Sequence, residues 1–177
     1  LDAGGWFSPR FAGERFLTLA EALDLAGDRL EINIHLKPAG AGVERLLDQA
    51  IEVIDASQRA GRDYLSCDPA SFQTARRLRP DLRLCYLGPQ PRNTPAALAT
   101  ACQQGSCNMQ VPHHQIDAGF VTLAHQHNMA INAIYIGPGS NDLDEMKRLV
   151  ACGIDGLLLD HAESWLEHSD SGFGPPR

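Results

Sequence analysis

The sequence predicts an α/β fold with a parallel sheet, because short segments of strand character alternate regularly with amphipathic segments of helical spacing. Five such strand–helix pairs follow one another along the 177 residues. No repeat, linker or low-complexity tract divides the chain, and only the last stretch, SDSGFGPPR, reads as a polar tail. We therefore expect one domain over residues 1–168 and a tail over residues 169–177.

The predicted strands cover residues 30–36, 63–67, 82–87, 130–137 and 153–160, and residues 108–112 fit a further short strand. The predicted helices cover residues 18–27, 43–57, 69–78, 95–103, 117–127 and 142–152. The first helix has Thr18 as its N-cap, Glu21 three positions later and Gly27 as its stop. Gly61 is expected to end the second unit, and Ser140 or Asn141 to cap the last helix.

The first predicted strand, LEINIHLK, narrows the fold class further. Its apolar residues alternate with Glu31, Asn33, His35 and Lys37, so one face of the strand is polar. A strand of an open parallel sheet is covered on both faces and is apolar throughout, whereas a closed barrel admits polar side chains near the C-terminal end of its interior. We therefore expect a barrel with His35 and Lys37 at its mouth.

Composition limits the partners and the compartment. The 22 acidic and 15 basic residues give a net charge of −7 with no basic cluster, which excludes nucleic acid and anionic lipid as expected partners. No apolar run reaches the roughly 18–20 residues that span a bilayer. The five cysteines are odd in number and mostly apolar in context, which favours buried free thiols and a cytoplasmic location. The missing initiator Met indicates a processed chain or part of a longer one.

Three stretches resemble the glycerophosphodiester phosphodiesterase family. They are GWFSPRFAGERFLTLAEAL (5–23), INIHLK (32–37) and NDLDEMKRLVACGIDGLLLD (141–160). They are similar to the family's G-W/S-F…F-x-G-E-x-I-P-T-L-E-E-A-L, L-N-I-E-L-K and N-D-x-E-E-M-x-R-L-L-x-x-G-V-D-G-I-I-T-D segments. Their order and spacing agree from residue 4 to about residue 168.

The resemblance implies a TIM (β/α)8-type barrel of the phospholipase-C-like phosphodiesterase superfamily, of which this chain holds about strands 4–8. It implies hydrolysis of a glycerophosphodiester to glycerol 3-phosphate and an alcohol, assisted by calcium or magnesium. The family's His-Arg-Gly opening, Glu-x-Asp metal pair and second catalytic His have no match here, so we expect the catalytic residues to be absent from this chain.

The resemblance also names candidate site residues. Lys37 stands where the family has a phosphate-contacting Lys, and His35 replaces a metal-ligand Glu. An imidazole is a poor ligand for calcium or magnesium, which prefer anionic oxygens, so His35 is either a ligand for a softer metal or a non-ligand. Tyr135, in the segment that replaces the family's Trp-Thr-Val-Asn, is the second expected substrate-binding residue.

Several other motifs could form binding sites, but each also has a simpler structural interpretation. CQQGSCNMQVPHH, residues 102–114, offers two thiols and two imidazoles, but its spacing matches no common zinc site, so we favour a helix end and a loop. GPGSND, residues 137–142, fits a phosphate cradle but more simply a turn. His125 and His127 are expected at the surface, and the aromatic residues at positions 6, 7 and 11 are expected to pack their loop down.

Two functions remain open on the sequence. The first is a phosphoric diester hydrolase in its complete form. The second is a non-catalytic member that binds phosphodiesters or a protein partner, which the replacement at residue 35 and the loss of Trp-Thr-Val-Asn favour.

A partial barrel leaves unpaired strand edges and an exposed apolar interior, so the isolated 177-residue chain is expected to form homo-oligomers. Light scattering on the purified chain measures this directly. A stable, monodisperse monomer is the result that contradicts it.

Overall fold

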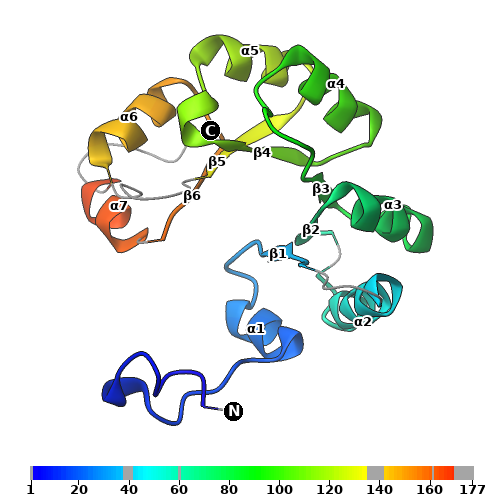
Figure 1. The fold of residues 1–177 in the computed structure, drawn as a ribbon, viewed down its shortest axis with the longest axis vertical. Coiled ribbons are helices and arrows are strands. Elements are labelled where there is room, and N and C mark those ends of the chain that lie inside the picture. The colour runs from blue at the N-terminus through cyan, green and yellow to red at the C-terminus, as the bar shows by residue number, and fades with distance from the viewer. Residues whose placement is uncertain (1, 38–41, 60, 135–141, 161, 170–177) are drawn as a thin grey trace. The chain divides into compact units, whose positions relative to one another are not determined.

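The computed structural model describes residues 2–37, 42–59, 61–134, 142–160 and 162–169 (Figure 1). The helices are α1 (Leu19–Ala26), α2 (Val43–Ala56), α3 (Pro69–Leu78), α4 (Pro95–Gln103), α5 (Ala118–Gln126), α6 (Leu143–Ala151) and α7 (Ala162–Ser169), with 3-10 turns at Pro9–Phe11 and His113–Gln115. The strands are β1 (Asn33–His35), β2 (Tyr64–Cys67), β3 (Leu84–Tyr86), β4 (Asn108–Pro112), β5 (Ala130–Ile134) and β6 (Gly156–Leu158).

The predicted α/β class is confirmed, and each of the six expected strand segments, the short one at residues 108–112 included, contains a strand. Each of the six strands in the described residues is followed by a helix, so α7 adds a sixth pair to the five strand–helix pairs that were expected. The segment Asn108–Pro112 is a full strand, and α7 is a helix that the sequence did not reveal. The strands are ordered β1-β2-β3 and β4-β5-β6, and β4, β5 and β6 are parallel.

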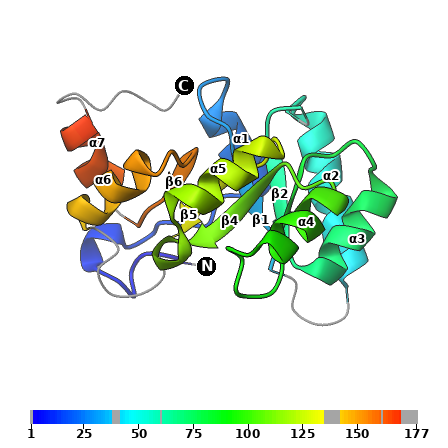
Figure 2. The same ribbon diagram turned by 90° about the horizontal axis from the view of Figure 1, so that it is seen from above.

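The chain forms two compact units, which are described separately. The first holds residues 1–65 and 74–83, and the second holds residues 66–73 and 84–177. In the second unit, α4, α5 and α6 cover one face of the sheet β4-β5-β6 (Figures 1 and 2). The apolar residues of that interface come from alternate strand positions; they include Met109, Val111, Ile131, Ala133, Leu98, Phe120 and Leu149.

Polar side chains occupy the other face of these strands. Gln110 lies between Met109 and Val111, and its register partner on β5 is Asn132, so both point away from the helices. Gln110 is 4% exposed, and its Nε2 donates a 2.8 Å hydrogen bond to Ser66 Oγ at the end of β2. The face of this sheet opposite the helices therefore carries polar side chains.

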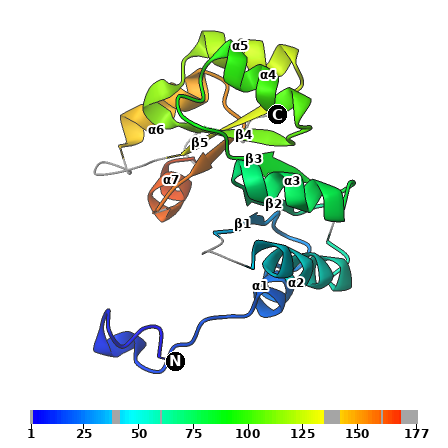
Figure 3. The same cartoon turned by 45° about the vertical axis from the view of Figure 1, so that its right-hand side comes forward.

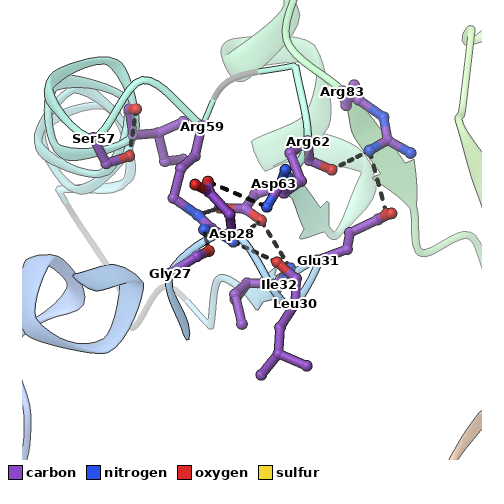
Figure 4. Close-up of polar contacts among 11 residues, drawn as sticks. Gly27, Asp28, Leu30, Glu31, Ile32, Ser57, Arg59, Arg62, Asp63 and Arg83 are labelled. Carbon is purple, nitrogen blue, oxygen red and sulfur yellow. Dashed lines mark hydrogen bonds and ion pairs between the residues drawn. The ribbon is translucent and has the colours of Figure 1, made fainter. Parts of the chain in front are cut away.

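A buried ion pair organises the first unit (Figure 4). Arg59 and Asp63 are 7% and 1% exposed, and the guanidinium binds the carboxylate through Nε at 2.6 Å and Nη2 at 2.9 Å. Arg59 also donates to the carbonyls of Gly27 and Leu30, and Asp63 Oδ1 accepts the Ile32 N–H at 2.8 Å. The pair therefore joins the end of α1, the start of β1 and the loop between α2 and β2 (Figure 3).

The local signals of the first helix are confirmed. Thr18 Oγ1 accepts the Glu21 N–H and the Glu21 carboxylate accepts the Thr18 N–H, which completes a capping box. Arg15 binds the same carboxylate and, with the bonds from Thr18, lowers the Glu21 pKa to about 2. Gly27 ends the helix with φ of 53°, a conformation that favours glycine.

Three boundaries differ from the prediction. The helix expected over residues 43–57 ends one residue earlier, at Ala56, and the left-handed φ of 58° at Gln58 ends the unit before the expected Gly61. The N-cap of α6 is Asp142, whose carboxylate accepts the N–H groups of Asp144 and Glu145, and not the expected Ser140 or Asn141. The first strand is shorter than residues 30–36, because the backbone before Asn33 bonds to Arg59 and Asp63.

The N-terminal aromatic residues do not pack down as expected. Trp6 is 82% and Phe7 71% exposed, and their rings meet edge to face at 5.8 Å. The loop is held instead by Asp2, whose carboxylate accepts the N–H groups of Gly4, Gly5 and Gly13.

Replacing Asp63 with Asn tests the buried pair. The change leaves the Arg59 charge buried without its counter-ion, so the free energy of unfolding is expected to fall by about 3 kcal/mol in urea denaturation. Asp48→Asn is the control, since this carboxylate lies exposed on α2 and surface substitutions of this kind usually change stability by about 0.5 kcal/mol or less. Equal stability losses in the two variants would show that the buried pair has no special role.

Candidate active site

The C-terminal end of β1 carries two of the three residues expected to form the site. His35 is the last residue of β1, Lys37 follows two positions later, and both are exposed. Ile34, which precedes His35, is 9% exposed and belongs to the core of the first unit. Alternation along an extended chain therefore places the imidazole and the ammonium group on the side opposite that core. Tyr135 and residues 137–141 of GPGSND lie outside the described residues.

The charge of this polar face is suited to an anion. Glu31 lies on the same face, but its carboxylate pairs with Arg83 at 3.2 Å. The Lys37 ammonium is a compact cation with three donors, and the His35 ring offers a nitrogen that bonds an oxyanion when it is protonated. Both side chains thus carry groups that can donate to an oxyanion.

The same face does not fit a calcium or magnesium site. Those ions take oxygen ligands, and His35 offers nitrogen. No group of three or more His, Cys, Asp or Glu side chains in the described parts of the chain is arranged to hold a metal ion. A metal at His35 would need ligands from outside these residues.

The Cys/His stretch of residues 102–114 forms a helix end, a strand and a turn. Cys102 lies in α4 and Cys107 precedes β4, whereas His113 and His114 lie in the 3-10 turn that follows β4. The two imidazole rings meet edge to face at 5.4 Å. The segment was expected to be a helix end followed by a loop. This prediction is confirmed at Cys102, near the end of α4, and at His113 and His114, in the turn after β4.

His113, Glu145 and Arg148 form an ion-pair network at the carboxyl end of β4, which the sequence did not predict. His113 Nδ1 lies 2.9 Å from Glu145 Oε1, and Arg148 binds the two carboxylate oxygens at 2.6 and 2.7 Å. Arg148 also donates to the carbonyls of Ile116 and His113. The hydrogen bonds from Arg148, with a smaller contribution from His113, lower the Glu145 pKa to about 2. The i, i+3 spacing of Glu145 and Arg148 could have predicted their ion pair, but not the contact with His113.

The thiols of Cys67 and Cys85 are not reactive groups. Both side chains are fully buried, and burial raises the pKa of each thiol to about 12. All five cysteines are free, as predicted, although Cys102, Cys107 and Cys152 are only partly buried.

A cavity of about 290 Å³ lies beside the loop between β3 and α4. Its lining comes from the end of β3, the loop, α4 and β4: Tyr86, Gly88, Pro89, Gln90, Pro91, Arg92, Thr94, Ala96, Ala97, Thr100, Met109 and Gln110. The loop has the sequence GPQPRNTP, residues 88–95. All its lining residues belong to the second unit.

Comparisons with known proteins agree on one family. A sequence model of the Glycerophosphoryl diester phosphodiesterase family matches residues 1–164. A glycerophosphodiester phosphodiesterase of Caldanaerobacter subterraneus subsp. tengcongensis is 26% identical over 179 residues, which cover 93% of this chain and 66% of the relative.

Solved structures show the same fold. A phosphodiesterase from Oleispira antarctica, in complex with the product sn-glycerol-3-phosphate, superposes with a TM-score of 0.81 at 18% identity, covering 97% of this chain and 68% of that one. A glycerophosphodiester phosphodiesterase from Parabacteroides distasonis gives a TM-score of 0.67 at 16% identity, covering 90% and 66%. The chain thus spans about two thirds of the length of these relatives.

The lowered pKa of Glu145 predicts an acid-dependent contribution to stability. The contribution is complete above the ordinary pKa of 4.5 and is lost as the pH falls toward about 2. In urea denaturation, Glu145→Gln should therefore be less stable than the wild type at pH 6, and the difference should shrink between pH 5 and pH 2.5. Glu44→Gln, at an exposed pair with Arg77, is the control and should differ little at any pH. A pH-independent difference for Glu145→Gln would contradict the network's role.

Proposed function

Because the chain belongs to the glycerophosphoryl diester phosphodiesterase family, we propose that it binds a glycerophosphodiester and, in the complete protein, hydrolyses it to glycerol 3-phosphate and an alcohol. The observation that carries the proposal is the exposure of His35 and Lys37 together at the carboxyl end of β1, which is where barrel enzymes bind their substrates. The product complex of the structurally similar Oleispira protein supports the same class of ligand.

The proposed role of Lys37 is electrostatic. A phosphodiester carries one negative charge, and additional charge develops on its oxygens when water attacks phosphorus. An ammonium group within hydrogen-bonding distance of those oxygens stabilises the developing charge. His35 would add a second donor when protonated, and Tyr135, at the expected seventh strand, is our proposed contact for the glycerol part.

The departing alcohol needs a proton from a general acid. We propose that this group lies outside residues 1–177, since the family's catalytic His motifs have no match in this sequence. Family members are metal-dependent, but the described residues do not fit calcium or magnesium, so we assign no step of the reaction to a metal ion held by them.

We further propose that the six strands are part of an eight-stranded barrel. The strand count, the parallel pairing of β4, β5 and β6, and the two-thirds coverage of the relatives all fit that fold. Residues 1–168 would then be one portion of that domain.

A second candidate function is a non-catalytic binding module. The observation in its favour is His35, because a neutral nitrogen replaces the anionic oxygen that a hard cation requires. Such a module would still bind glycerol 3-phosphate through Lys37. The enzyme and the binding module would both bind the phosphate-containing ligand, but only the enzyme would hydrolyse a glycerophosphodiester.

Hydrolysis of glycerophosphocholine by the full-length protein, with calcium or magnesium, distinguishes the two. If the protein is an enzyme, Lys37→Ala should lower kcat/KM by about 100-fold, the size of effect seen when one donor to a developing oxyanion is removed. Lys147→Ala is the matched control, because that lysine lies on α6 and pairs only weakly with Asp144 at 3.7 Å.

His35→Glu tests the metal-ligand position. A rise in metal-dependent turnover is expected if the rest of the site is intact. Absence of turnover in both the wild type and His35→Glu, together with saturable binding of glycerol 3-phosphate in calorimetry, would reject the enzyme and support the binding module.

A further inference from the structure

The cavity beside the β3–α4 loop contains the positive charge of Arg92, which no acidic side chain of the described residues neutralises. Arg92 Nε donates to the Gly88 carbonyl at 2.8 Å, and Nη1 donates to the Gln110 carbonyl at 3.1 Å. Both carbonyls belong to residues that line the cavity, so the guanidinium forms part of its wall. Within the described residues Arg92 has no carboxylate partner, in contrast to Arg59 and Arg148.

Partial burial makes this charge costly. Burial lowers the Arg92 pKa, because the group loses water that two neutral carbonyls replace only in part. No hydrogen bond to Nη2 is formed by the part of the chain that the structure describes. An anion in the cavity could accept from Nη2 and supply the missing negative charge.

The remaining lining is mostly apolar or already satisfied. Thr100 Oγ1 donates to the Ala96 carbonyl and can then only accept, whereas Thr94 Oγ1 accepts the Ala97 N–H and keeps its O–H as a donor that a ligand could use. The Tyr86 ring lies against Gly88, where an added Cβ would approach Tyr86 Cε1 to 2.7 Å.

The cavity volume of about 290 Å³ lies close to the lower end of the range of small-molecule sites, roughly 300–1,000 Å³. A few polar groups in an apolar wall are typical of such sites. We propose that this cavity binds a small organic anion, with its phosphate or carboxylate group beside Arg92 and its apolar part against Tyr86 and Met109. Neither His35 nor Lys37 is among the residues that line this cavity.

Phenyl phosphate and benzoate are suitable probes, because each joins an anionic group to one ring. Titration followed by ¹⁵N NMR should give saturable shifts in residues 86–100, and phenol or inorganic phosphate alone should bind at least about tenfold more weakly. Arg92→Gln should weaken phenyl phosphate binding by about tenfold or more, because a charge-assisted hydrogen bond is lost.

Ala96→Leu tests the cavity without touching the charge. The larger side chain fills space at the lining and should abolish binding, whereas Ala99→Leu, at an exposed position of α4 outside the lining, should leave it unchanged. Arg92 also holds the loop through its hydrogen bond to the Gly88 carbonyl, so Arg92→Gln could fail to fold. In that case the comparison of Ala96→Leu with Ala99→Leu still tests whether the cavity binds the anion. Binding at the proposed diester site would instead shift residues 33–37.

Three results would overturn the proposal. They are the absence of saturable shifts in residues 86–100 with both probes, equal binding by a folded Arg92→Gln variant or by Ala96→Leu, and shifts in residues 33–37 in place of residues 86–100. The last result would assign the anion to the diester site, whereas failure of glycerophosphocholine hydrolysis would leave the cavity proposal intact.

Discussion

The buried Arg59–Asp63 pair is the constraint on which the first unit depends. A guanidinium and a carboxylate at 7% and 1% exposure are tolerated only when nearly all their donors and acceptors are satisfied. Here the two groups bind each other, two carbonyls and one N–H, which come from the end of α1 and the start of β1 (Figure 4). The bonds to Leu30 and Ile32 fix the residue at which β1 begins. They therefore also determine which residues lie at the C-terminal end of that strand.

The position of the candidate site follows from that constraint. Once Ile32 is held by Asp63, alternation puts Ile34 into the core and places His35 and Lys37 on the opposite side. A slip of one residue would bury the two polar groups and expose Ile34. The ion pair and the phosphate-binding proposal are thus linked through the register of a three-residue strand.

The molecule uses arginine in two different ways. Arg59 and Arg148 pair with carboxylates of the chain itself, so their charges are neutralised by the protein, and both side chains join separate segments. Arg92 meets only carbonyls beside a cavity, so part of its charge remains available to a ligand. The net charge of the chain is −7, so its overall field repels anions. A cation such as Arg92 can attract an anion locally in spite of that field.

The sequence by itself determined the features that depend on neighbouring residues. The Thr18–Glu21 capping box, the Gly27 stop and the strand–helix alternation were predicted, because caps and periodicity involve residues a few positions apart. The family followed from motifs whose residues are contiguous. Tertiary structure alone decided the contacts of Arg59 with Leu30, 29 residues away, of Glu145 with His113, 32 residues away, and of Arg92 with Gln110, 18 residues away. Such pairs depend on how strands register and helices pack, and no local pattern in the chain encodes which distant carbonyl or carboxylate a side chain will meet.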